Sequence, residues 1–316
     1  MADYREDGLI HGARVVHFAG QRVVPLLALL AALLMVGTGC AYIDVKQKEF
    51  IWRPSPTTWW SKFDVKANGV AELWIARNGE SVVPAVDAAD EGNGDRLHVW
   101  WWRHPRAEAP VMLYLHGARW NLQGNAFRIA RLRDMGFSVL AIDYRGFGRS
   151  GGDLPSEADA YADAAIAWDY VKKLAPEASR RYLYGHSLGG AIAIELATRG
   201  DDLAGIIVES TFTSIRDLAG TYTLGRILPI GWFLTQHYDS LSRIEKVHVP
   251  KLFVHGANDR FVPAWMTERL YERANGAKRL LLVEGANHSN STGVGFEQYR
   301  VALQEMFGLR QHAALQ

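Results

Sequence analysis

The stretch Gly185-His186-Ser187-Leu188-Gly189 decides the fold of this chain. A short apolar run that is typical of a buried strand precedes it, at residues 181–184, and an alanine- and leucine-rich run that is typical of a helix follows it, at residues 190–197. A serine between two glycines, on a tight turn from a strand to a helix, is the context of a nucleophile elbow. The backbone at such a serine is strained, and a Cβ two residues before or after it would clash. The pattern therefore predicts that Ser187 is a nucleophile.

Composition bounds the classes of protein that fit. The chain has 316 residues, of which 48% are hydrophobic and 22% charged, as in a globular protein with a full core. The net charge is +1 and there is no long basic run, which argues against nucleic acid as a partner. The one cysteine, Cys40, cannot form a disulfide within the chain and offers no metal-binding spacing, so we predict no metal site.

The N-terminus carries the features of an export signal. Residues 1–22 include three arginines, residues 23–36 are apolar, and small residues stand directly before Cys40. We therefore predict a signal peptide over residues 1–39. The end of this segment resembles a bacterial lipobox, in which the cysteine is lipidated and becomes the mature N-terminus; Gly37 departs from that pattern, because leucine is usual there. The protein would then be a lipoprotein anchored in the cell envelope, with its catalytic domain outside the cytoplasm.

Two alternatives to lipidation stay open. Residues 23–43 carry no charge and are long enough to span a membrane, so the segment can also be an uncleaved anchor. Simple cleavage and secretion is the other alternative. In the anchor and lipoprotein interpretations alike, the arginine-bearing flank stays inside and the catalytic domain lies outside the cytoplasmic membrane.

The rest of the chain is predicted to be one catalytic domain, residues 63–316, preceded by a lipidated N-terminus and connector, residues 40–62. The prolines and tryptophans of the connector favour an extended segment on the surface. Strands are expected at residues 70–76, 96–103, 111–115, 137–142, 181–184, 203–208, 251–255 and 279–283. Within residues 96–103, alternation places Trp100 and Trp102 on one face and Trp101 on the other, as aromatic packing on a sheet requires. Residues 211–249 hold two short helical patterns and leave room for only a small lid.

The loop after residues 111–115 is a candidate oxyanion hole. It begins His116-Gly117, and an H-G loop after this strand supplies one backbone N–H, while the residue after the serine supplies the other. We assign these donors to Ala118 and Leu188. His116 is expected to fix the loop by hydrogen bonds.

Two further loops supply the remaining parts of a catalytic triad. Asp259 follows the strand at residues 251–255, and His288 follows the strand at residues 279–283. Ser187 needs a base to take its proton, the imidazole of His288 titrates near neutral pH, and Asp259 would orient that imidazole. Asp143 also ends a strand, but it precedes the serine, and the usual chain order is serine, aspartate, histidine.

Across residues 65–310 the chain resembles the α/β-hydrolases. The resemblance is carried by residues 115–117, 143–148, 185–190 and 209–213, by His255-Gly256 with Asp259, and by residues 285–288. It is greatest with the small-lid, ABHD-type serine hydrolases, related to monoacylglycerol lipase and to serine-aminopeptidase-like hydrolases. It implies an α/β fold with an eight-stranded, mostly parallel sheet, helices on both faces, a Ser/His/Asp triad and no cofactor. Residues 118–120 depart from the small residues that are common in the oxyanion loop.

The favoured function is a serine hydrolase that cleaves carboxylic esters or thioesters, through an acyl-enzyme on Ser187. The partner would be a small-molecule ester, and membrane anchoring favours an acyl lipid. A peptidase or amidase of the same fold is the first alternative, and a non-catalytic binding protein is the second. The three triad residues argue against the second, and a serine at the nucleophile position argues against a dehalogenase. The sequence leaves the oligomeric state open.

Overall fold

The structure, a computed structural model, describes residues 37–54, 63–85, 95–223, 231 and 233–309. The chain divides into two compact units, residues 1–47 and 48–316, and the sheet belongs to the second. The predicted signal peptide up to residue 36 and the connector from residue 55 to 62 lie outside the described residues. Within the described ranges, no helix combines the length and the apolar character that a membrane crossing requires.

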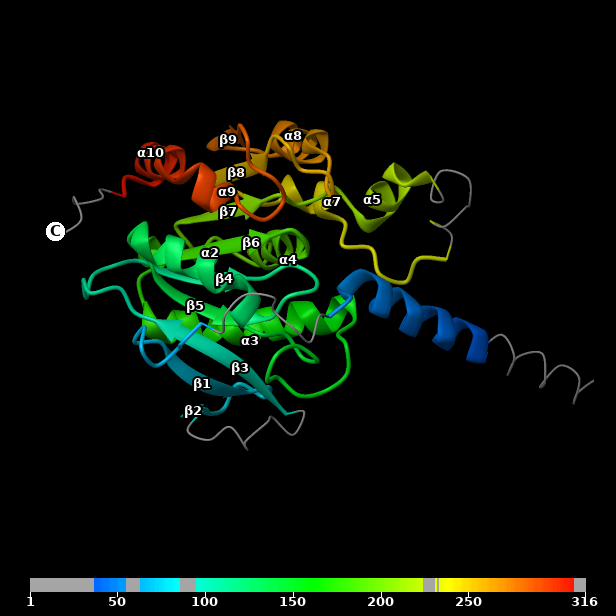
Figure 1. Cartoon of the computed structure of the whole chain (residues 1–316), viewed down its shortest axis with the longest axis horizontal. Helices are drawn as coiled ribbons and strands as arrows, with labels where there is room; N and C mark the ends of the chain where they lie inside the picture. The colour runs from blue at the N-terminus through cyan, green and yellow to red at the C-terminus, as the bar shows by residue number, and fades with distance from the viewer. Residues whose placement is uncertain (1–36, 55–62, 86–94, 224–230, 232, 310–316) are drawn as a thin grey trace, which may run out of the picture. The chain divides into compact units, whose positions relative to one another are not determined.

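The second unit is built on one nine-stranded sheet in the order β2-β1-β3-β5-β4-β6-β7-β8-β9 (Figure 1). The strands from β5 to β9 are parallel, and β3 pairs antiparallel with both β1 and β5. The strand bounds are β1 Ala71–Ala76, β2 Val82–Pro84, β3 Arg96–Trp102, β4 Val111–Leu115, β5 Ser138–Ile142, β6 Arg181–His186, β7 Gly205–Glu209, β8 Lys251–Gly256 and β9 Lys278–Val283. The α/β-hydrolase fold that the sequence predicts is confirmed. The short edge strand β2 was not expected, because three residues are too few to show an alternating pattern.

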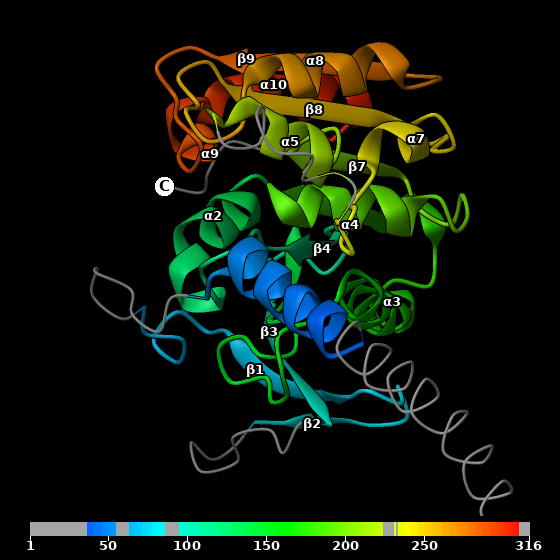
Figure 2. The ribbon, with the colours of Figure 1, turned by 90° about the vertical axis from the view of Figure 1, so that its right-hand side faces the viewer.

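Helices cover both faces of the sheet. The side chains of α2, Leu122–Asp134, and α10, Phe296–Phe307, join one buried cluster, and those of α3, Glu157–Leu174, α4, Leu188–Ala197, and α8, Ala264–Arg273, join the other. Helix α4 lies between α3 and α7, Ser240–Ile244 (Figure 2). The remaining short helices are the 3-10 turn Ala178–Arg180, α5 Ile215–Thr221 and α9 Ser291–Val294. The expected small lid is represented by α5 and α7, while residues 224–230 and 232 lie outside the described part.

Local sequence explains where the crossover helices begin. Ser156 and Asp159 form a capping box at the start of α3, where each side chain binds the other's backbone N–H. Asn121 caps α2 by accepting the N–H of Gly124. The strands β4, β5 and β7 are buried along their whole length, as their continuous apolar sequences require in a sheet covered on both faces. The predicted face alternation is also confirmed, since Trp100 and Trp102 join one buried cluster and Trp101 packs on the other.

The described part of the connector is not extended, contrary to the prediction from the sequence, although most of it lies on the surface as expected. Residues 37–52 are helical, and Trp52 is only 1% exposed. The indole packs against the rings of Tyr144, Phe147 and Tyr238, and its N–H donates to the carbonyl oxygen of Pro155 at 2.8 Å. A single aromatic residue carries no periodic pattern, so its burial depends on contacts with distant parts of the chain.

Candidate active site

Ser187 lies on a strained turn between β6 and α4. Its φ is 54° and its ψ is −120°, a region that residues with a side chain rarely adopt. Its N–H donates to Glu209 O at 2.8 Å, and its carbonyl accepts the hydroxyl of Thr211 at 2.7 Å. A Cβ on Gly185 would stand 2.2 Å from the carbonyl oxygen of Gly189, so glycine is required there. These contacts make the strand-turn-helix that the sequence predicts.

Asp259 and His288 are directly hydrogen-bonded. His288 Nδ1 donates to Asp259 Oδ2 at 2.7 Å, and Asp259 Oδ1 accepts the backbone N–H groups of Phe261 and Val262. The Asp259 side chain is fully buried, whereas that of His288 is 15% exposed. Burial alone would raise the pKa of Asp259, but the hydrogen bonds from His255 and His288 hold it below its usual value. Asp259 is therefore ionised and fixes the orientation of the His288 ring.

The His288 loop contacts the turn that carries Ser187. His186, the residue before Ser187, donates from Nε2 to the carbonyl oxygen of His288 at 2.7 Å, and the two imidazole rings lie 4.9 Å apart. Burial, with the nearby Arg128 cation, lowers the pKa of His186 well below its usual value, so this ring is neutral. Between the two described residues Ser187 and His288 there is no hydrogen bond in this structure. Asp259 engages Nδ1 of His288 and not Nε2.

The loop after β4 touches the same turn. A Cβ on Gly117 would lie 3.0 Å from Ser187 Cβ, so the loop passes directly beside the serine. Leu188 is the first residue of α4, and its N–H has no acceptor within the helix. Ala118 is partly buried in the loop, whose first residue, His116, is fully buried and hydrogen-bonded at Nδ1 to Gly117 O at 2.6 Å. The two expected oxyanion donors thus lie on the two segments that meet at Ser187.

The backbone of Trp52 joins this loop, a contact that sequence reasoning missed. Its carbonyl oxygen accepts the N–H of Arg119 at 2.8 Å, and Arg119 has a φ of 77°. The end of the N-terminal helix therefore fixes the residue that follows Ala118. No local pattern points to this contact, because it joins two segments that are far apart in the sequence.

Sequence reasoning also missed a buried polar network beneath the His288 loop. Glu209, at the end of β7, accepts the hydroxyls of Tyr184 and Tyr299 and lies 3.3 Å from Arg128 Nε. Arg128 Nη2 in turn donates to the carbonyl oxygen of Ser289 at 2.8 Å. Burial lowers the pKa of Arg128, but the nearby negative charge of Glu209 outweighs burial and raises it. Arg128 therefore stays protonated. A charged residue on the core-facing side of α2 is the signal that would have revealed this support for the loop.

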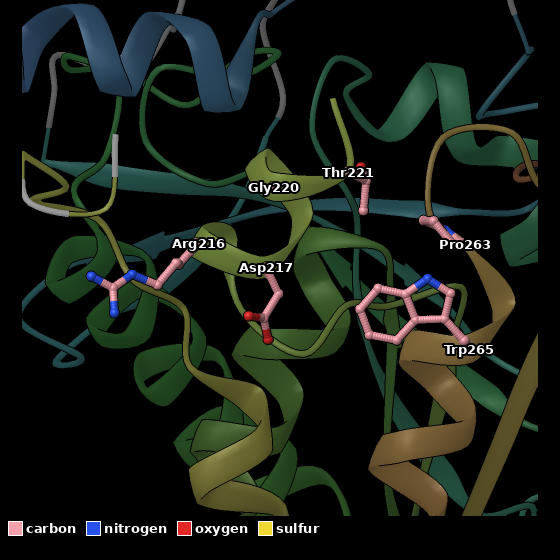
Figure 3. Close-up of a pocket in the computed structure, with 6 residues that line it drawn as sticks. All are labelled: Arg216, Asp217, Gly220, Thr221, Pro263 and Trp265. Carbon is pink, nitrogen blue, oxygen red and sulfur yellow. The ribbon is translucent and has the colours of Figure 1, made fainter. Parts of the chain in front are cut away.

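A hollow of about 440 Å³ lies between α5 and α8 (Figure 3). Its wall includes Trp265 and Pro263, and Pro263 directly follows Val262, which donates to Asp259. Asp217, on the opposite wall, accepts the hydroxyl of Thr213. The hollow is therefore next to the Asp259 loop, because one of its lining residues directly follows a residue that is hydrogen-bonded to Asp259. In the described part of the chain, no group of three histidine, cysteine, aspartate or glutamate side chains is arranged to hold a metal ion.

Comparison with known proteins places the chain among α/β-fold hydrolases. The family described as serine aminopeptidase, S33, matches residues 106–240. An uncharacterized protein of Mycobacterium tuberculosis is 31% identical over 274 residues, which cover 85% of this chain and 89% of the relative. The lysophosphatidylserine lipase ABHD12 of Danio rerio is 31% identical over 200 residues, 57% of this chain and 51% of that protein.

A solved structure supports the fold. An esterase from Pyrococcus furiosus superposes with a TM-score of 0.60 at 19% sequence identity, over 80% of this chain and 100% of the other. The chain belongs to the α/β-hydrolases, in one family with the Mycobacterium tuberculosis relative, and is a hydrolase of that fold.

Proposed function

We propose that this protein is a serine hydrolase of carboxylic esters, with Ser187 as nucleophile, His288 as general base and Asp259 as its orienting carboxylate. The observation that carries the proposal is the pairing of a strained serine at φ 54° with an aspartate–histidine hydrogen bond of 2.7 Å on the neighbouring loop. A serine nucleophile needs both features. The strained turn presents its hydroxyl, and the histidine supplies a base whose second nitrogen is not bonded to the aspartate.

The reaction follows from these positions. His288 Nε2 takes the proton of Ser187 as Oγ attacks the acyl carbonyl, and the backbone N–H groups of Ala118 and Leu188 hold the oxyanion that develops. His288 then gives its proton to the leaving alcohol, and the acyl group stays on Ser187. Water, deprotonated by the same histidine, releases the acid and restores the enzyme.

We propose an acyl-lipid ester as the substrate. A thioester could be cleaved by the same acyl-enzyme reaction. A curated relative is a lysophosphatidylserine lipase, which acts on a lipid. The exposed Phe261 beside the site and the wall of the hollow at Trp265 offer apolar surface for an acyl chain.

The decisive experiment is a series of para-nitrophenyl esters from acetate to palmitate, assayed with the full chain and with Ser187→Ala. We expect hydrolysis that Ser187→Ala abolishes, with an optimum at medium or long acyl chains. An acetate optimum would contradict the lipid-ester part of the proposal. Background hydrolysis equal in both proteins, on every ester, would contradict the esterase.

A peptidase or amidase is the second candidate, because the description of the matching family is that of an aminopeptidase. An aminopeptidase requires a carboxylate for the substrate amine. Asp259 is occupied by His288, and Asp217 in the hollow is hydrogen-bonded to Thr213, so the described site favours the ester. Para-nitroanilides of amino acids, assayed beside the esters, distinguish the two activities.

We also propose that the protein is held in the cell envelope by a lipid on Cys40. Cys40 is exposed, as a residue that is to be acylated must be. Mass spectrometry of the protein purified from membranes would give the mass of a diacylglyceryl cysteine at the N-terminus. An intact signal segment in that spectrum would favour the uncleaved anchor, and an unmodified Cys40 would favour secretion.

A further inference from the structure

The backbone of Arg119 is held in an unusual conformation beside the proposed oxyanion hole. Its φ of 77° lies in the left-handed region, which is strained for a residue with a long side chain. Its N–H donates to the carbonyl oxygen of the buried Trp52 at 2.8 Å, and the Trp52 indole is itself tied to Pro155. The fold therefore sets the direction in which the Arg119 side chain leaves the loop.

Arg119 is the outer member of a row of three side chains. Its guanidinium carbon lies 5.8 Å from the ring centroid of Phe261, a cation–π distance. The Phe261 ring in turn lies 5.6 Å from the imidazole of His288, and the backbone N–H of Phe261 donates to Asp259. The row runs from an exposed cation to the proposed general base.

The proposed reaction puts the alcohol part of an ester beside this row. His288 must return a proton to the leaving oxygen, so the alcohol part lies against His288. The acyl oxygen lies at Ala118 and Leu188. Because Phe261 packs on His288, a cation over Phe261 faces the alcohol part of the substrate.

No carboxylate in the described part of the chain neutralises the positive charge of Arg119. Among the described residues none forms an ion pair with its guanidinium. Asp259 is engaged by two histidines, Asp217 accepts from Thr213, and no ion pair joins the exposed Glu284 to Arg119. A planar guanidinium in such a place binds a carboxylate or a phosphate through two parallel hydrogen bonds.

We propose that Arg119 selects esters whose alcohol part carries a carboxylate or a phosphate. The inference rests on the proposed esterase function and specifies its substrate class. Arg119 is a specificity-determining residue, which contacts the charged group and not the reacting atoms. Because the guanidinium is exposed, its removal is expected to cost about tenfold in kcat/KM for an anionic ester.

The test uses esters that carry a charge on the alcohol side, on the acyl side or on neither. Meta-acetoxybenzoate carries its anion on the alcohol side, meta-acetoxybenzamide is its neutral counterpart, and monophenyl adipate carries its anion on the acyl side. A monoacylglycerol and the same monoacylglycerol bearing a phosphate form a second, lipid pair. Arg119→Gln removes the charge and keeps the same backbone strain, Arg119→Lys keeps the charge without the fork, and Arg260→Gln removes a neighbouring exposed cation as the matched control.

We expect Arg119→Gln to lower kcat/KM about tenfold for meta-acetoxybenzoate or for the phosphate-bearing lipid, and less than about twofold for the neutral partners. Arg119→Lys should be intermediate, Arg260→Gln should show no such preference, and added salt should weaken the preference of the native protein. A response of the lipid pair alone assigns the anion to a lipid head group, and a response of the aryl pair alone assigns it to a soluble alcohol.

Three results would overturn the inference. Equal losses on charged and neutral esters would mean that Arg119 only supports the loop. A loss confined to monophenyl adipate would place the anion on the acyl side. If the native protein hydrolyses none of these esters in a Ser187-dependent manner, the proposed function itself fails, and the Ser187→Ala control separates that failure from the first two.

Discussion

Two polar clusters in this molecule combine histidines and carboxylates in opposite ways. In the proposed active site one carboxylate, Asp259, stands between two imidazoles, with His288 Nδ1 at 2.7 Å and His255 Nε2 at 3.3 Å. On β3 one imidazole, His98, stands between two carboxylates, with Glu72 at 3.0 Å and Asp143 at 3.4 Å. Both clusters contain an aspartate just past the end of a parallel strand. By its position in the sequence, either aspartate is a candidate for the acid of a catalytic triad.

The difference between the clusters is which histidine nitrogens stay available. Both nitrogens of His98 face carboxylates, and its side chain is 4% exposed. Burial lowers the pKa of His98, but the hydrogen bonds to Asp143 and Glu72 outweigh burial and raise it. His288 has one nitrogen tied to Asp259 and one left for a substrate. Two carboxylates thus favour the cationic form of the histidine between them, whereas a carboxylate between two histidines leaves an imidazole nitrogen for proton transfer.

The largest expected effect is on kcat and comes from replacing the aspartate of each cluster in turn. Asp259→Asn should lower kcat by about 10⁴, because the amide favours the wrong tautomer of His288 and cannot stabilise its cation. Asp143→Asn should keep most of kcat, since the Asn oxygen still accepts the N–H of Leu122, the bond that Asp143 makes at 2.9 Å. Initial rates on the best ester, measured for both variants, give the answer. Comparable losses of kcat would mean that Asp143 belongs to the catalytic machinery.

The second effect concerns stability. His98→Gln removes the imidazole from the buried Asp143, while Glu72 keeps its ion pair with Arg149 at 3.4 Å. The free energy of unfolding should fall by about 3 kcal/mol, because a buried pair broken on one side leaves the Asp143 charge without this partner. The kcat of the folded variant should stay close to that of the native protein. Urea unfolding and ester turnover measure the two quantities on one preparation. A large fall in kcat with unchanged stability would exchange the roles of the two clusters.

The sequence predicts one cluster and not the other for a physical reason. Ser187, Asp259 and His288 each follow a strand in parallel register, and parallel strands bring their carboxyl ends to one edge, so strand order alone gathers them. Contacts such as His98 with Glu72, or Trp52 with Arg119, depend on how segments distant in sequence cross. No periodicity records that crossing. The fold and the candidate triad were therefore within reach of the sequence, whereas the supports of the triad were not.

A third, smaller effect on kcat is expected from His255, the second imidazole of the active-site cluster. His255 is fully buried, its Nδ1 bonds to the hydroxyl of Thr267 at 2.7 Å, and its Nε2 faces both Asp259 and the carbonyl oxygen of Val262. Two acceptors at Nε2 require a proton there. His255→Gln should lower kcat about tenfold at an unchanged KM, because Asp259 loses one of its orienting bonds. A rise in KM alone would assign His255 to substrate binding.

The smallest effect is a pH dependence that comes from His98. Its folded pKa is raised above the unfolded value of 6.5, so its stabilisation is fully present below pH 6.5 and is lost as pH rises through the folded pKa. The difference in unfolding free energy between the native protein and His98→Gln should therefore be larger at about pH 5.5 than at about pH 9. Glu72→Gln, which removes one of the two carboxylates, should show part of the same pH dependence, because the remaining Asp143 still raises the pKa of His98. Urea unfolding of the three proteins at both pH values measures it. A difference that grows toward high pH would mean that His98 is buried neutral, and the contrast between the two clusters would then rest on geometry alone.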